Sequence, residues 1–229
     1  QSGTQARRAL PFGAGERATY QVKLGGLSVG SGTLSIVGTE AIEGHATLHA
    51  QLFISGGVPL ARVDDRYETW FDPDGLFSRR FRQNVHEVRY RRDRTYHFSP
   101  EHKTYRRENG ETGTLGTEKP LDDVSFLYFA RTLPLNVGDT YRLTRYFKES
   151  GNPVVLRVVR RETVKVPAGT FRTVVVQPTI QTTGLFGQGG QAEVYFSDDE
   201  RRLVVMVKTR VPVVGSLAMY LQSYTAGAR

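Results

Sequence analysis

The chain has 229 residues, of which 38% are hydrophobic and 24% are charged, a balance that is ordinary for a globular protein. No apolar run approaches the roughly 20 residues that a membrane-spanning helix needs, so the sequence excludes such a helix. The absence of cysteine excludes disulfides, thiol catalysis and cysteine-ligated metals, and the formal net charge of +8 favours acidic partners.

The first part of the chain alternates between apolar and polar residues, which is the pattern of strands with one buried face. Residues 1–15 lack this period and are predicted to form an N-terminal arm, whereas residues 16–229 are predicted to form a single β-rich domain. Gly25-Gly26, Gly56-Gly57 and Asp74-Gly75 mark turns between strands. The strands expected here cover residues 18–24, 29–37, 45–54 and 61–71.

Two further strands, expected at 81–92 and 94–105, carry most of the positive charge. Residues 79–107 contain ten basic and three acidic residues, and so hold seven of the eight net charges. Side chains alternate across a strand, and neither face of this basic hairpin is apolar enough to form core. We therefore expect at least one face to meet solvent or a partner. The candidate partner-binding residues are Arg89, Tyr90, Arg91, Arg92, Arg94 and Tyr96.

Three interpretations of the basic hairpin stay open. It could be a solvated hairpin whose arginine stems cover aromatic rings, or it could bind either an anionic lipid surface or a protein partner. Nucleic acid is not expected as a partner, because no helix-turn-helix, zinc-finger or ribonucleoprotein motif accompanies the charge.

One helix is predicted, at about residues 122–132, after a loop rich in Gly, Thr and Glu at 108–119. Asp122 is a good N-cap, and the helix must end before Pro134. Apolar residues surround nearly the whole circumference, which is typical of a helix that is buried on every side. We therefore expect this helix to lie inside the fold.

After Gly138-Asp139 the strand pattern resumes and continues towards the end of the chain. The turns between these strands recur at a spacing typical of antiparallel meanders. The sequence thus predicts an all-β, mainly antiparallel fold: a strongly curved sheet or open barrel with one buried helix near 122–132 in its concave side. The strands expected in this half cover residues 141–147, 154–166, 171–180, 192–196, 203–209 and 217–224.

No motif defines a catalytic site. Gly26 to Gly30 matches the G-x-S-x-G nucleophile elbow, but a strand pattern follows Ser28 where that motif needs a helix. The pair Asp64-Asp65 should point to opposite faces of a strand, and Asp198-Asp199 should serve a turn. We expect no enzyme activity, no cofactor and no metal. Two alternatives stay open: a hydrolase, and a metal site made by His86, His97 and His102.

Several stretches, taken together, resemble one known family. They are DDVSFLYFARTLPL (122–135) with Gly138-Asp139, VPAGTFRT (166–173), and FSDDERRL (196–203) followed by Gly215-Ser216-Leu217. With GERATY (15–20) and Gly30-Ser31-Gly32, the chain resembles the bacterial domain-of-unknown-function 3108 family across about residues 16–224. The resemblance implies an exported, β-rich envelope protein, and it supplies no catalytic residues.

These inferences predict an exported, non-catalytic protein of the cell envelope, soluble or peripheral, in the periplasm or at the extracellular face. The start at Gln1, without an initiator Met, suggests a signal peptide already removed. Two binding roles compete. One is an accessory module that docks on a membrane-associated assembly or an anionic surface through the arm and the basic hairpin. The other is a carrier that holds a lipid or apolar ligand between the curved sheet and the helix.

Overall fold

The computed structural model describes residues 9–228 except 59–60, 88–89, 181–191 and 212–214. The described chain contains one α-helix, α1 (Asp123–Ala130), and two short 3-10 helices, η1 (Pro100–His102) and η2 (Glu149–Gly151). Its strands are β1 (Arg17–Leu24), β2 (Leu27–Ile42), β3 (His45–Val58), β4 (Ala61–Asp72), β5 (Phe77–Glu87), β6 (Tyr90–Ser99), β7 (Thr104–Arg107), β8 (Thr112–Thr114), β9 (Thr140–Leu143), β10 (Val154–Val166), β11 (Gly169–Thr179), β12 (Glu193–Ser197), β13 (Val204–Val211) and β14 (Gly215–Thr225).

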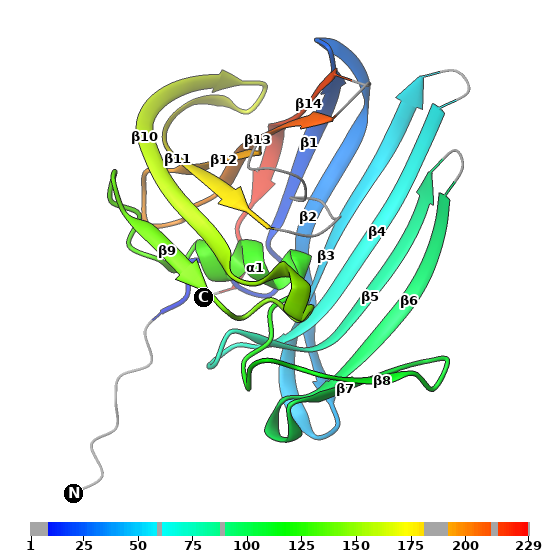
Figure 1. Cartoon of the computed structure of the whole chain (residues 1–229). Helices are drawn as coiled ribbons and strands as arrows, with labels where there is room; N and C mark the ends of the chain where they lie inside the picture. The colour runs from blue at the N-terminus through cyan, green and yellow to red at the C-terminus, as the bar shows by residue number, and fades with distance from the viewer. Residues whose placement is uncertain (1–8, 59–60, 88–89, 181–191, 212–214, 229) are drawn as a thin grey trace, which may run out of the picture.

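These strands form one 14-stranded antiparallel sheet, in the order β8-β7-β6-β5-β4-β3-β2-β1-β14-β13-β12-β11-β10-β9. Two meanders are therefore joined where the first and last strands pair, with Arg17 opposite Thr225 and Leu24 opposite Leu217. The sheet curls around α1 (Figure 1). The prediction of an all-β, mainly antiparallel, strongly curved sheet is confirmed.

Helix α1 is buried on nearly every side, as its apolar circumference predicts. Seven of its eight residues are buried, and Phe129 is half-buried. Asp122 Oδ1 accepts hydrogen bonds from the backbone N–H groups of Val124 and Ser125, while Ser125 Oγ accepts one from the N–H of Asp122. This capping box satisfies the free donors at the start of the helix. None of the helices in the described ranges is both long and apolar enough to span a membrane.

The segment before α1 connects the two halves of the sheet. The backbone N–H of Leu121 donates to the Arg145 carbonyl, and the N–H of Phe147 donates back to the Leu121 carbonyl. On the other side, the N–H of Ser78 in β5 donates to the Pro120 carbonyl. These hydrogen bonds fix the start of α1 between β5 and the segment that follows β9.

The chain ahead of β1 also contributes to the core. Phe12 is buried, and its ring lies 4.9 Å from the ring of Tyr128 in α1 and 6.1 Å from that of Phe71 in β4. Residues 1–8 of the predicted arm lie outside the described residues. The part of the arm that is described thus packs against the domain.

The sequence pattern divides the two basic strands at residue 93, and the structure shows this boundary to be wrong. Strand β5 ends at Glu87 and β6 begins at Tyr90, directly opposite it, so Asp93 lies inside β6. This register pairs Phe81 with Tyr96, and both of these side chains are buried. Burial of these two aromatic side chains favours this register over one that divides the strands at residue 93.

Candidate functional site

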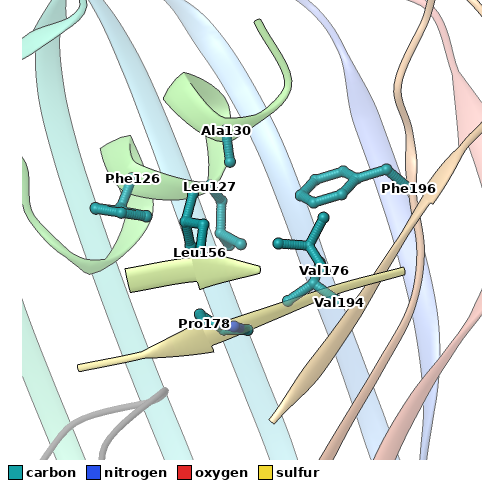
Figure 2. A pocket seen from close by; sticks show the side chains of 8 residues that line it. All are labelled: Phe126, Leu127, Ala130, Leu156, Val176, Pro178, Val194 and Phe196. Carbon is teal, nitrogen blue, oxygen red and sulfur yellow. The ribbon is translucent and has the colours of Figure 1, made fainter. Parts of the chain in front are cut away.

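An apolar recess lies on the concave side of the sheet, between α1 and strands β10 to β12 (Figure 2). Its helix side chains are spaced at positions i, i+1 and i+4 and point towards the strands. Every side chain that lines it is apolar, so the recess can hold hydrocarbon but offers no group for acid–base chemistry. The lining residues are Phe126, Leu127, Ala130, Leu156, Val176, Pro178, Val194 and Phe196.

The recess is small in this structure. Its volume is about 20 Å³, which is room for about one water molecule. The helix residues Phe126 and Leu127, and Leu156 of β10, are all buried around it. A longer stretch of hydrocarbon can therefore enter only if side chains that line the recess move.

A fully buried carboxylate lies at the start of α1. Besides capping the helix, Asp122 accepts hydrogen bonds at Oδ2 from Thr69 Oγ1 (2.5 Å) and Ser78 Oγ (2.6 Å). Burial raises the pKa of Asp122 to about 6, although these hydrogen bonds stabilise the ionised form. The sequence predicts only the capping role of Asp122. Its partners Thr69 on β4 and Ser78 on β5 are distant in the chain, so these hydrogen bonds could not be predicted.

The next residue, Asp123, is buried on a different side of the helix. Its Oδ1 accepts a hydrogen bond from Tyr146 Oη (2.9 Å), and its Oδ2 accepts one from Gln83 Nε2 (3.3 Å). Burial raises the pKa of Asp123, and the Tyr146 hydrogen bond and the charge of Lys148 oppose this. Each carboxylate at the helix start thus has its own partners and ties α1 to the sheet.

The predicted partner-binding residues divide between two faces of β6. Arg92 and Arg94 are half-buried on the inner, concave face, and Arg91 is exposed on the outer face. Arg89 and the side chain of Tyr90 lie outside the described residues. The residues of this set that are described therefore do not form a single surface.

Tyr96 belongs to an aromatic cluster in the core. Its ring centroid lies 5.0 Å from that of Phe147 and 5.6 Å from that of Tyr105. The residue is only 4% exposed, so its side chain is not available to a macromolecular partner.

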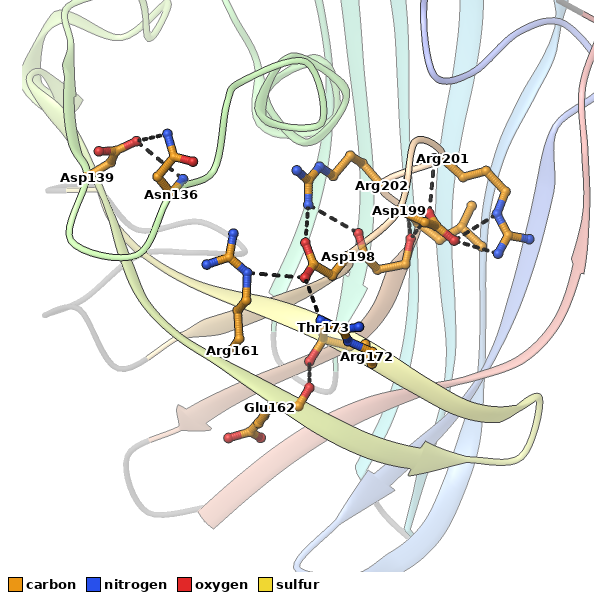
Figure 3. Close-up of polar contacts among 12 residues, drawn as sticks. Asn136, Asp139, Arg161, Glu162, Arg172, Thr173, Asp198, Asp199, Arg201 and Arg202 are labelled. Atoms are coloured by element: carbon orange, nitrogen blue, oxygen red, sulfur yellow. Dashed lines mark hydrogen bonds and ion pairs between the residues drawn. The ribbon is translucent and has the colours of Figure 1, made fainter.

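The Asp198-Asp199 pair serves the connection between β12 and β13, as expected (Figure 3). Asp199 Oδ1 accepts a hydrogen bond from the backbone N–H of Arg201 at 3.0 Å, which closes a turn. Asp198 forms ion pairs with Arg161 of β10 and with Arg202 (Figure 3). The two aspartates of the FSDDERRL stretch therefore have structural roles: Asp199 closes the turn, and Asp198 ties it to β10.

The remaining candidate catalytic and metal-binding residues are dispersed. Ser28 lies within β2, so a strand follows it as its sequence predicts. His86 and His102 are exposed, and His97 is half-buried on β6. Over the described ranges, no group of three or more His, Asp or Glu side chains is placed to hold a metal ion.

The lining of the recess could not be singled out from the sequence, because most of its residues belong to ordinary apolar patterns. Pro178 is the exception: it lies inside β11, opposite Leu156, where it cannot donate to the hydrogen-bond ladder. A proline within a strand pattern is therefore the signal that could have pointed to this place.

Together, the fold and the site define an all-β protein whose curved antiparallel sheet encloses a helix, with an apolar recess beside that helix. The chain belongs to the family described as "Protein of unknown function (DUF3108)", whose model matches residues 19–222. This confirms the family resemblance seen in the sequence.

The solved structures found to be similar have low sequence identity to this chain. A β-barrel-like protein of domain of unknown function DUF1849 from Brucella abortus has a TM-score of 0.57 at 12% identity, over 96% of this chain and 100% of that one. A candidate exported protein with a YmcC-like fold from Bacteroides fragilis has a TM-score of 0.34 at 14% identity, over 96% and 100%. A candidate lipoprotein from Parabacteroides distasonis has a TM-score of 0.35 at 10% identity, over 94% and 98%. The first likeness supports the fold alone. No curated protein matches the chain.

Proposed function

We propose that this protein is a non-catalytic binding module of the cell envelope that holds the apolar part of a ligand between α1 and the concave face of the sheet. The observation that carries the proposal is the recess, whose eight lining side chains are all apolar. Concave, mostly apolar sites in the mouths of curved sheets are common places for ligands. The location in the cell envelope is supported by the family resemblance.

Burial of hydrocarbon would supply the affinity. Each CH₂ group removed from water contributes about 0.8 kcal/mol. The small recess volume means that a ligand must first displace side chains that line it, and this displacement costs part of that gain. We therefore expect weak binding of short chains and tighter binding as the chain lengthens.

Filling the recess should weaken binding. Replacing Ala130 by leucine adds three carbon atoms to a side chain that lines it. The affinity for dodecyl maltoside, an uncharged amphiphile used below its micelle concentration, should fall by about tenfold, which corresponds to about 1.4 kcal/mol of lost burial. Isothermal titration calorimetry measures the change.

The matched control makes the same substitution at Ala41, an exposed residue of β2, and should bind like the unaltered protein. Circular dichroism checks that both variants are folded. Equal affinity of the Ala130→Leu variant and the unaltered protein would count against the recess as the binding site. Turnover of an ester, glycoside or peptide substrate that one substitution abolishes would overturn the non-catalytic part of the proposal.

The second candidate function is an accessory module that docks on a membrane-associated assembly or an anionic surface through the outer face of β5 and β6. Arg82 and Arg91 favour this role, because both are exposed there. Arg82 has a partner in Asp93 at 3.7 Å, but an exposed ion pair of this kind is weak and can exchange with a partner.

Removing these two outer charges tests the docking role. The Arg82→Ser/Arg91→Ser variant should bind severalfold less to the native envelope fraction in a sedimentation assay. Binding of the unaltered protein should itself fall as salt rises to about 0.15 M, because exposed charges are then screened over about 8 Å. The control is Arg157→Ser/Lys165→Ser, which removes two exposed cations from β10. Equal losses in both variants would contradict docking through β5 and β6.

A further inference from the structure

Three cations gather around the aromatic cluster on the inner face of β6 and β7. Arg107 lies opposite Tyr96 in the strand register, and its guanidinium carbon is 5.8 Å from the centroid of that ring. Lys148 Nζ is 5.3 Å from the ring centroid of Phe147, which in turn is 5.0 Å from that of Tyr96. Arg94 precedes Tyr96 by two residues and so shares its face of β6. We call Arg94, Arg107 and Lys148 the inner cationic cluster.

The charges of this cluster act on one another. Burial lowers the pKa of Lys148, the positive charges of Arg94 and Arg107 add to this effect, and the charge of Asp123 opposes it. Arg107 has an ion-pair partner in Glu111. Over the part of the chain that the structure describes, neither Arg94 nor Lys148 forms an ion pair. The half-buried inner face thus carries two cations, Arg94 and Lys148, that have no ion-pair partner among the described residues.

A buried polar group faces the cluster from β5. Gln83 lies opposite Arg94 in the strand register and is only 3% exposed. Its Nε2 donates to Asp123 Oδ2, but its Oε1 accepts no hydrogen bond from the described residues. A buried acceptor without a donor is unfavourable, so this site suits a ligand that brings an O–H group, which a singly protonated phosphate monoester does.

We propose that the inner cationic cluster, with Gln83 beside it, binds a phosphate group. Arginine presents a fork of N–H donors that matches two phosphate oxygens, and lysine adds a compact positive charge. The inference rests on the proposed function, because it names the polar end of the ligand whose apolar part occupies the recess. Asp123, which Gln83 contacts, precedes Leu127 of the recess by about one helix turn, or about 5.4 Å. An amphiphile with its head beside Gln83 would therefore have to span about one helix turn to place its chain in the recess.

The test compares dodecyl phosphate with dodecyl maltoside, which share the apolar chain and differ in the charge of the head. The unaltered protein should bind dodecyl phosphate about tenfold more tightly by isothermal titration calorimetry at low salt. The Arg94→Gln/Lys148→Gln variant should lose this preference while keeping its affinity for dodecyl maltoside. The matched control, Arg157→Gln/Lys165→Gln, removes two exposed cations of β10 and should retain the preference.

Butyl phosphate, which has almost no apolar chain, separates the two sources of a phosphate group. Binding of butyl phosphate as tight as that of dodecyl phosphate would identify a free phosphate ester, and binding of the long chain alone would identify a lipid head. The inference is overturned if the unaltered protein shows no preference for dodecyl phosphate, or if the Arg94→Gln/Lys148→Gln variant keeps that preference. Failure of dodecyl maltoside to bind while both phosphates bind would overturn the proposed use of the recess and leave the phosphate site standing.

Discussion

Replacing Arg131 by methionine is expected to lower the free energy of unfolding by about 3–5 kcal/mol, because it leaves the Glu16 carboxylate buried without its cation. Both residues are 3% exposed. The guanidinium meets the carboxylate through two hydrogen bonds, Nη1 to Oε1 at 2.5 Å and Nη2 to Oε2 at 2.9 Å. The same side chain donates to the carbonyl oxygens of Pro11 and Arg201, which would lose this donor as well.

Arg131 has this large effect because it lies where three parts of the chain meet. It follows the last residue of α1, and it contacts both the segment ahead of β1 and the connection between β12 and β13. Its guanidinium carbon also lies 5.0 Å from the ring centroid of Phe12 and 5.4 Å from that of Tyr128. Loss of this contact should therefore loosen the end of the helix that carries Ala130 of the recess.

Urea unfolding followed by circular dichroism measures this loss. The control is Arg201→Met, which removes an arginine from a partly exposed ion pair with Asp199 and should change stability by less than about 1 kcal/mol. Adding Glu16→Gln to Arg131→Met should recover part of the loss, because no buried charge then remains. Equal losses in Arg131→Met and Arg201→Met would mean that burial of the pair does not matter.

The features that follow from local pattern are the ones that the sequence predicts well. The strand expected at 154–166 is β10 with the same bounds, and the helix expected at about 122–132 is α1 with Asp122 as its cap. Alternation in a strand and apolar residues all round a helix are properties of neighbouring residues, so they can be seen without the fold. The strand boundary at residue 93 fails because pairing of Phe81 with Tyr96 is a contact between strands.

Contacts between distant parts of the chain could not be predicted in this way. Glu16 and Arg131 are 115 residues apart, and Asp122 is 53 residues from Thr69. Alternation correctly separates Arg91 from Arg92 and Arg94, but it does not tell which of the two faces becomes concave. That depends on how the whole sheet curls, and Lys148 joins the inner cationic cluster only as a result of that curvature.

The contribution of Asp122 to the free energy of unfolding is expected to fall by about 2 kcal/mol as the pH rises from about 4 to about 7. Burial raises the pKa of this carboxyl group to about 6 in the folded protein, whereas in the unfolded chain it is about 3.9. Between these values the unfolded chain has released the proton that the folded protein still holds. Raising the pH therefore favours unfolding, and the contribution that is complete below about pH 4 is lost as the pH passes about 6.

Replacing Asp122 by asparagine should remove this part of the pH dependence. The asparagine oxygen can still cap Val124 and Ser125, and the hydroxyl groups of Thr69 and Ser78 can rotate to accept from its amide N–H groups. Relative to the unaltered protein, the free energy of unfolding of the variant should thus rise by about 2 kcal/mol between about pH 4 and about pH 7. Urea unfolding at several pH values measures the difference.

Two comparisons make this result specific to Asp122. Asp64→Asn changes an exposed aspartate of β4 and should follow the pH dependence of the unaltered protein. A smaller slope should persist in Asp122→Asn, because burial also raises the pKa of Asp123. If instead the stability difference between Asp122→Asn and the unaltered protein stays constant over this range, the four hydrogen bonds to Asp122 outweigh its burial. In that case the carboxylate is ionised throughout and acts as a permanent cap that fixes α1 against β4 and β5.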